Sequence, residues 1–225
     1  NVALSDSIQA GIYMKHPRII RIKADMVDQM DYDKILSMYQ DRFKDASDFT
    51  FIFVGNVDVE KMKPVIAEYL GALPAVNRKE TFKDNKIEMR QGIYKNEFTK
   101  QQETPKASVF AFYNGDCKYD LRNNLLLSMT SQILDLVYTE KVREDEGGTY
   151  GVYVGGTLQK YPKEKAILQI IFDTAPEKKE KLMKIIFGEI DNITKTGPSE
   201  ANLNKVKEYM LKKHTEDLKE NSYWL

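Results

Sequence analysis

The sequence is poor in the residues that most often carry catalysis or cross-link a small fold. Among 225 residues there is one cysteine, Cys117, and there are two histidines, His16 and His214. A single cysteine excludes an intrachain disulfide. Neither histidine has a partner at the spacing of a known zinc motif, so we expect no metal site in these residues. Cys117 follows a predicted strand with no histidine nearby in sequence, and we interpret it as a structural thiol.

Net charge and long apolar runs are also missing. Lysine plus arginine equals aspartate plus glutamate, 34 of each, which leaves no overall field to attract a nucleic acid. The basic-looking runs near the C-terminus mix both signs at helical spacing, which is typical of solvated helix faces. No stretch of 18 apolar residues occurs, and the first residues lack the pattern of a signal peptide. We therefore expect neither a nucleic-acid partner nor membrane insertion.

What the sequence does contain is enough apolar material for a packed core. Hydrophobic residues make up 42% and aromatic residues 11% of the chain, while 30% of the residues are charged. The chain starts without any leader pattern and ends on the apolar residues Tyr223, Trp224 and Leu225. We expect it to be a piece of a longer polypeptide.

In the first third of the chain, apolar periodicity predicts a helix over 27–45. The aromatic and β-branched run at 49–54 predicts an interior strand. Asp58 is a predicted N-cap for a helix that ends at Gly71, a residue suited to the left-handed position after a helix. Pro64 inside that helix predicts a kink or a later start. Residues 75–105 are polar and are interpreted as a connector, with a possible strand at 92–98.

The remainder alternates strands and helices more clearly. We predict a strand over 106–115, a long helix over 120–143, and two strands in direct succession at 149–157 and 165–173. Thr174 to Glu177 has the form of a capping box and predicts the start of a helix that ends at Gly197, before a final helix. The long helix is predicted to bury one stripe, formed by Leu121, Leu125, Met129, Ile133, Leu136 and Val137. The strand over 165–173 is predicted to face the core with Ala166, Leu168, Ile170 and Phe172.

Two successive strands joined by a short loop favour an antiparallel hairpin over a purely parallel sheet. The predicted fold class is therefore α+β, a two-layer sandwich of mainly antiparallel sheet with helices packed on one face.

The stretch VREDEGGTYGVYVGG holds the one candidate site. Arg143 and Tyr150 lie seven residues apart across a double glycine, where a helix turns into a strand. Helix-dipole compensation and an ordinary strand aromatic could explain the two residues separately. A short turn would also bring two donors to the same end of the sheet, where they could hold a peptide carbonyl. No nucleophile elbow, P-loop or dinucleotide motif is present, so we assign no catalytic residue.

The stretches HPR, DRFKDASDFTF, FTFIFVGNVDVEKMKPVIAEYLGALP and VREDEGGTYGV together resemble the insulinase and pitrilysin family of zinc peptidases, in its bacterial four-domain branch. The resemblance covers nearly the whole chain from His16 onward. It implies a processing-peptidase-like fold, with 1–74 closing a preceding domain, 75–94 as connector and 95–225 as the larger part of the last, non-catalytic domain. It also implies that Arg143 and Tyr150 bind substrate.

The family's zinc motif, H-x-x-E-H, is absent from this sequence. The resemblance therefore implies that zinc belongs to the intact protein, in an N-terminal catalytic half, and that this region alone is inactive. The implied partners are that half and a peptide or polypeptide substrate, and the implied location is the periplasm or cell envelope. Two alternatives remain open: a non-catalytic scaffold within a larger complex, or an independent peptide-binding module. The residues that precede Asn1 would distinguish the scaffold from the peptidase, by the presence or absence of H-x-x-E-H.

Overall fold

The computed structural model describes residues 2–101, 103–144 and 151–225, with the backbone alone for residues 143 and 144. The chain divides into two compact units. One comprises Asn1–His16 and Ile87–Lys212, and the other comprises Pro17–Lys86 and Lys213–Leu225. Each is described by itself, and the domain boundaries expected from the resemblance remain a prediction.

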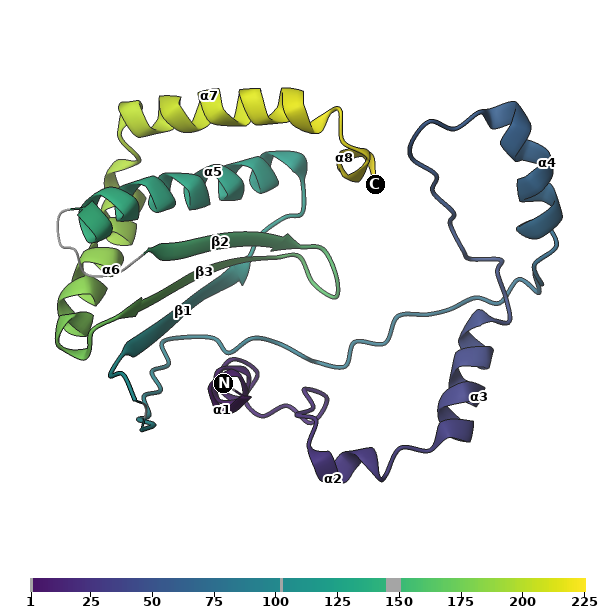
Figure 1. The fold of residues 1–225 in the computed structure, drawn as a ribbon, viewed down its shortest axis with the longest axis horizontal. Coiled ribbons are helices and arrows are strands. Elements are labelled where there is room, and N and C mark those ends of the chain that lie inside the picture. The colour runs from purple at the N-terminus through teal and green to yellow at the C-terminus, as the bar shows by residue number, and fades with distance from the viewer. Residues whose placement is uncertain (1, 102, 145–150) are drawn as a thin grey trace. The chain divides into compact units, whose positions relative to one another are not determined.

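The first unit is built on a three-stranded sheet (Figure 1). Its strands are β1 (Ala107–Asp116), β2 (Val152–Gln159) and β3 (Lys165–Thr174), in the order β1-β3-β2. Both pairings are antiparallel, and the β2–β3 hairpin is the one that the short connection predicted. All three strands lie within two or three residues of their predicted positions.

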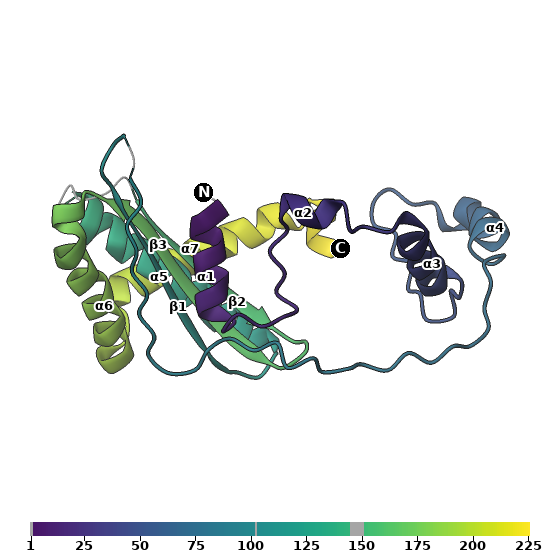
Figure 2. The same ribbon diagram turned by 90° about the horizontal axis from the view of Figure 1, so that it is seen from below.

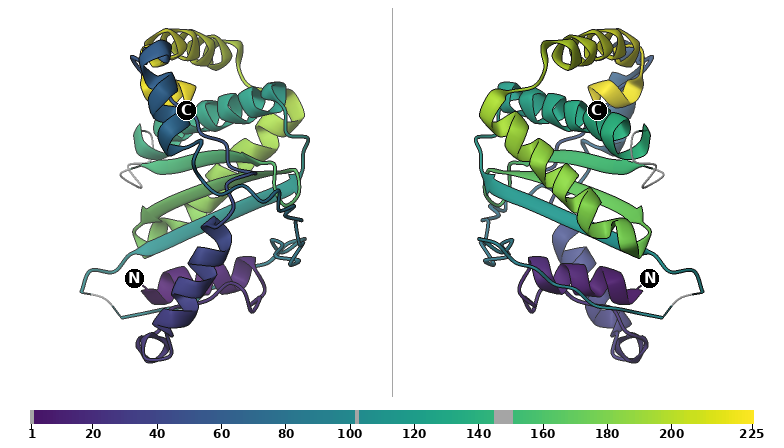
Figure 3. Two further views of the ribbon diagram at one scale, coloured as in Figure 1. Left: turned by 90° about the vertical axis from the view of Figure 1, so that its right-hand side faces the viewer. Right: turned by 90° about the vertical axis from the view of Figure 1, so that its left-hand side faces the viewer.

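Two helices cover one face of this sheet: α5 (Leu121–Tyr138) and α6 (Lys179–Thr196) (Figures 2 and 3). The strand register places alternate residues of all three strands on that face, with Phe172 between Val109 and Val152, and Ile170 between Ala111 and Val154. The fully buried core joins sheet and helices: Leu134, Tyr138, Val142, Val152, Ile170, Phe172, Leu182 and Ile186. The predicted α+β sandwich with helices on one face is confirmed, as is the inward direction of Ile170 and Phe172.

A third helix, α7 (Glu200–Asp217), packs on α5 through a smaller cluster formed by Ile133, Val137 and Val206. Because α5 has partners on two sides, its buried residues do not form one stripe. The expected stripe is right at Ile133 and Val137 but wrong at its other end, where Leu121 is 75% exposed. Leu134 and Tyr138, which the single stripe left out, point instead into the sheet core.

The helix ends follow local chemistry with one exception. Asp120 caps α5 by accepting from the Asn123 N–H, and Gly197 ends α6 with φ of +75°. The expected capping box at Thr174 is wrong, because Thr174 is buried and is the last residue of β3, where it pairs with Ala107. A short 3₁₀ turn, η2 (Pro176–Lys178), leads into α6 without a side-chain cap.

The N-terminal helix α1 (Val2–Ile12) is joined to the residues that precede β1. The Arg90 N–H and Nε donate to the carbonyls of Ile12 and Gly11, and the Arg90 guanidinium lies 4.1 Å from the centre of the Tyr94 ring. The possible strand at 92–98 does not form.

The second unit contains α2 (Ala24–Val27), α3 (Tyr32–Phe43), α4 (Val59–Tyr69) and α8 (Asn221–Trp224). Asp58 caps α4 as predicted, and Pro64 lies inside that helix, which begins at Val59. Gly71 is not left-handed as expected. It is needed for space instead, because a Cβ there would lie 2.5 Å from the Ala67 carbonyl oxygen.

The strand expected at 49–54 is wrong: these residues form no regular secondary structure. A strand requires a neighbour to accept its main-chain hydrogen bonds, and no segment of the described residues pairs with this one. Its aromatic side chains instead continue a row of rings that begins on α3. Tyr39, Phe43, Phe49 and Phe51 follow each other at centroid distances of 4.6, 5.8 and 6.2 Å.

Candidate functional site

The predicted site lies where α5 leads into β2. A π-helical segment, η1 (Thr139–Glu144), follows α5 directly and contains Arg143. Tyr150 and the side chain of Arg143 lie outside the described residues, so the proposed pairing of these two side chains stays a prediction.

Buried residues flank the segment 143–150 on both sides. Tyr138 and Val142 on one side are fully buried, and Val152 on the other is 7% exposed. The Tyr138 hydroxyl donates to the Ile186 carbonyl at 3.0 Å, and burial raises the pKa of this phenol well above its usual value. The residues that flank this segment on both sides therefore belong to the core.

Two adjacent glycines of β2, Gly155 and Gly156, leave space on opposite faces of the strand. A Cβ at Gly156 would lie 2.6 Å from Ser131 Oγ and 2.7 Å from Leu127 Cγ, so glycine allows α5 to lie against the strand. A Cβ at Gly155 would lie 2.6 Å from the Tyr153 hydroxyl. Glycine there lets the tyrosine ring lie along the strand.

Tyr153 and Gln169 form a polar pair on the face that α5 and α6 leave uncovered. Gln169 lies opposite Gly155 in the register, and its Nε2 donates to the Tyr153 hydroxyl at 3.4 Å. Tyr153 is 55% exposed. Sequence reasoning missed this pair because the β2–β3 register decides it. The double glycine after a tyrosine was the available signal.

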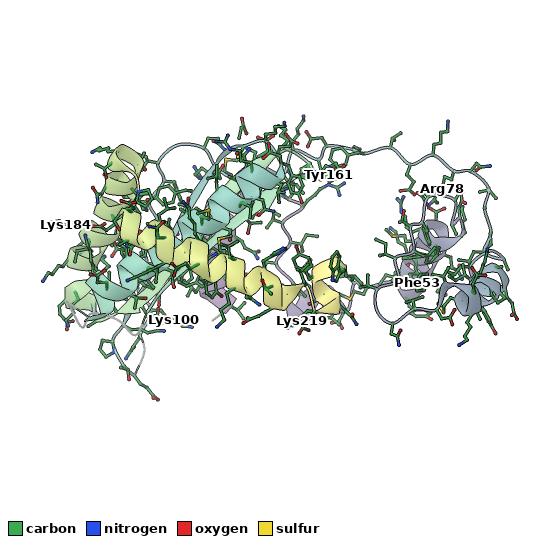
Figure 4. The ribbon with its side chains drawn as sticks, turned by 90° about the horizontal axis from the view of Figure 1, so that it is seen from above. Phe53, Arg78, Lys100, Tyr161, Lys184 and Lys219 are labelled. Carbon is green, nitrogen blue, oxygen red and sulfur yellow. The ribbon has the colours of Figure 1, made fainter. Side chains whose placement is uncertain are left out.

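A second feature missed by the sequence is the buried carboxylate of Asp45, which is 1% exposed. It accepts from the backbone N–H of Ser47, Val76 and Arg78 at 3.0, 3.0 and 2.7 Å, and also from the Ser47 hydroxyl. The Ser47 hydroxyl is the main cause of a pKa far below the usual aspartate value, and the three backbone donors add to it. The Arg78 guanidinium donates to the carbonyls of Asp41 and Arg42 at the end of α3 (Figure 4, where Arg78 is labelled).

Among the described residues, no three His, Cys, Asp or Glu side chains are grouped so that they could hold a metal ion. His214 instead contacts an aromatic neighbour, with its Nδ1 at 3.2 Å from the Tyr223 hydroxyl. In the same described part of the chain, no helix combines the length and the apolar character needed to cross a membrane.

The chain matches a known protein family and several solved structures. Residues 29–210 match the family described as the peptidase M16 inactive domain. The chain belongs to this family. A relative of known family, the zinc protease PQQL-like protein of Arabidopsis thaliana, is 23% identical over 91% of the chain.

Solved structures agree on the fold of the M16 inactive domain. The periplasmic protease PqqL of Escherichia coli superposes over 99% of the chain with a TM-score of 0.78 and 18% identity. A mutant of the ferredoxin protease FusC, solved in complex with Arabidopsis ferredoxin, covers 98% with a TM-score of 0.73 and 14% identity. An M16 inactive domain from Pseudomonas fluorescens covers 92% with a TM-score of 0.65 and 19% identity.

The chain spans about a quarter of the larger relatives: 23% of the Arabidopsis protein, 25% of the PqqL chain and 24% of the FusC chain. It spans half of the Pseudomonas domain structure. At these identities the structural matches establish the fold, and the activities of the whole relatives belong to those proteins.

Proposed function

We propose that this chain is a substrate-binding, non-catalytic region of a zinc metallopeptidase. The observation that carries the proposal is the match to the M16 inactive domain over residues 29–210, together with a zinc-protease relative about four times as long. In this proposal an N-terminal half of the same polypeptide holds zinc on an H-x-x-E-H motif and cleaves the substrate. The region described here contributes binding and orientation.

Arg143 and Tyr150 are the proposed substrate contacts. The guanidinium and the phenol would hold the backbone of the bound peptide and stabilise the oxygen that gains negative charge during cleavage. The burial of Tyr138, Val142 and Val152, which flank residues 143–150, supports this role, because donors stabilise developing charge best when the structure beside them is held in place.

The test uses the full-length protein that carries this region. Arg143→Ala and Tyr150→Phe should each reduce kcat/KM about 100- to 1000-fold, the loss typical of one removed oxyanion donor. Zinc content should stay at the wild-type level, since neither residue belongs to the metal site. Steady-state kinetics with a peptide substrate and metal analysis of the same preparations measure both quantities.

Matched controls separate this role from a general effect on folding. Arg122→Ala removes an exposed arginine from the other end of α5, and Tyr209→Phe removes an exposed hydroxyl from α7. Both should leave kcat/KM unchanged. Wild-type kinetics in Arg143→Ala and Tyr150→Phe would remove the assignment.

The cellular location of the intact protein is also proposed from a relative. A periplasmic or cell-envelope site for the intact protein is proposed from the periplasmic protease PqqL, whose fold this chain shares. Fractionation of cells that express the intact protein, followed by immunodetection, tests it.

A further inference from the structure

One acidic residue interrupts the apolar face of α6. The core-facing residues of this helix recur at intervals of three and four: Leu182, Ile186, Ile190 and Ile193. Glu189 lies at the same spacing, three residues after Ile186, and its side chain is 15% exposed. A carboxylate held this far from water loses most of its hydration, so it needs an opposite charge to offset the loss.

Lys141 of η1 supplies that charge. Its Nζ donates to Glu189 Oε1 at 2.5 Å, and the lysine side chain is 45% exposed. The cationic end of the pair is therefore partly hydrated, whereas the acidic end depends on the contact. A short, charge-assisted hydrogen bond of this kind joins η1 to α6 at one defined point.

The ion pair is one of three contacts that join this part of the chain to α6. The Tyr138 hydroxyl donates to the Ile186 carbonyl, and Val142, directly before Arg143, is fully buried in the same core cluster as Ile186. Apolar burial is not directional, so the packing of Val142 leaves the rotation of η1 less defined. The hydrogen bond from Lys141 is directional, and it therefore also sets this rotation.

The conformation of η1 makes such a contact important. A π-helical turn is rare, and π-helical turns often occur at functional sites. The backbone of Arg143 belongs to this turn. The direction in which the Arg143 side chain leaves the backbone therefore depends on keeping η1 in its π-helical form and in its place on α6.

We propose that Glu189 is a positioning residue for Arg143, and that it acts by holding η1 on α6 through Lys141. This inference rests on the proposed function, because Glu189 affects cleavage only if Arg143 contacts the substrate. In this proposal Glu189 itself touches neither substrate nor metal. A displacement of about 1 Å in a group that binds the transition state can lower the rate about 100-fold, so a positioning contact can matter to activity.

An ion pair that only stabilises the fold would have different consequences. Replacement of a buried ion pair by apolar groups is often neutral for stability. When Glu189 is made apolar, Lys141 can turn to solvent, and no unpaired charge stays buried. A positioning role therefore predicts a loss of activity without a matching loss of stability.

The first measurement compares activity with stability. Glu189→Met places an apolar side chain of similar length on the apolar face of α6. It should lower kcat/KM of the full-length protein about tenfold, while the 225-residue chain melts like wild type. Glu97→Met is the control, because the Glu97 carboxylate forms an ion pair with Lys179 at the first residue of α6. Both its kcat/KM and its melting temperature should stay at the wild-type values.

The second measurement is a double-mutant cycle with Arg143 in the full-length protein. If Glu189 acts through Arg143, Glu189→Met should add nothing once Arg143→Ala has removed the guanidinium. The kcat/KM of the double variant should then equal that of Arg143→Ala. A general effect on the fold would instead multiply the two losses.

Hydrogen exchange of the 225-residue chain tests the contact without any catalysis. Glu189→Met should speed amide exchange at residues 139–142, because η1 opens more readily when this contact to α6 is lost. Glu97→Met should leave exchange at these residues unchanged.

The possible results separate this inference from the proposed function. If Arg143→Ala lowers kcat/KM but Glu189→Met does not, or if the two losses multiply, the positioning role falls and the proposed function stands. Unchanged exchange at residues 139–142 in Glu189→Met also overturns the positioning role alone. Wild-type kinetics in Arg143→Ala overturn both the substrate contact and the positioning role.

Discussion

At the scale of single residues, Asp45 is the side chain on which the second unit depends most. It is the one fully buried charged residue among those described, and it accepts from the nearby Ser47 N–H and from the Val76 N–H, 31 residues along the chain. Removing an acceptor from buried N–H groups leaves them without a partner, which costs stability.

Asp45→Ala should therefore lower the melting temperature of the second unit, since the N–H groups of Ser47, Val76 and Arg78 lose their acceptor. Asp48→Ala, three residues later and exposed, is the matched control and should melt like wild type. Thermal unfolding followed by tyrosine fluorescence measures the difference. Equal melting temperatures for the two variants would contradict the role given to Asp45.

The same carboxylate predicts a pH dependence. The pKa of Asp45 is depressed below its ordinary value of 3.8 in the folded chain, so the unfolded chain takes up the proton more readily. The stabilisation is complete above that ordinary value and is lost as the pH falls below it toward the folded-state pKa. The gap in melting temperature between wild type and Asp45→Ala should be constant from pH 7 to about pH 5 and close in stronger acid. A gap that persists unchanged at pH 2 would contradict this.

At the scale of elements, the contact between α5 and β2 has no spare room at Gly156. Gly156→Ala introduces a Cβ within 3 Å of Ser131 and Leu127, so the helix or the strand must move. We expect a loss of about 1–3 kcal/mol in the free energy of unfolding. Gly115→Ala on β1, where a Cβ would meet nothing within 4 Å, should have little effect. Urea denaturation of both variants makes the comparison.

The sequence predicted those elements whose partners are close in the chain. Clear apolar periodicity marks the three strands and the helices α5 and α6. The short β2–β3 loop makes the pairing of β2 with β3 local. The prediction failed at 49–54, where strand-forming residues have no neighbour to pair with in the described part of the chain. Propensity indicates what a segment can form, and pairing decides whether it does.

The candidate sites divide in the same way. Arg143 and Tyr150 could be predicted as a site from the sequence, because the two residues lie close together in the chain; the prediction stands as a proposal. The Tyr153–Gln169 pair joins residues 16 apart and depends on strand register, which periodicity does not set. For Asp45, the bond to Ser47 is local and could have been anticipated as an Asx turn, whereas Val76 and Arg78 could not.

At the scale of the whole molecule, the two units differ in what holds them together. Every buried hydrophobic side chain among the described residues belongs to the unit that contains Ile87–Lys212. The other unit has Asp45 as its buried residue and leaves Phe49, Phe51 and Phe53 at least 36% exposed. Apolar burial is the main source of stability, so the units should open independently and at different free energies.

Native-state hydrogen exchange of the intact chain tests this difference. Amides at the centre of β3, around Ile170 and Phe172, should exchange slowest, because both side chains are buried in the core. Amides of α3 and α4, which contain no buried residue, should exchange much faster. Protection of α4 equal to that of β3 would show that the units unfold together.

The attachment of Asp45 to Val76 and Arg78, with the Ala46 N–H bound to the Pro74 carbonyl at 2.8 Å, closes the intervening residues into a loop with a narrow neck. In a chain with a single cysteine, these hydrogen bonds close the loop as a disulfide often does. Protonation of Asp45 in acid, and not a reductant, would open them. Extra residues inserted after Gly71 would enlarge the loop without disturbing the neck, because closing a longer loop costs only slightly more entropy. A reporter peptide could therefore be inserted after Gly71 without breaking the hydrogen bonds that hold α3.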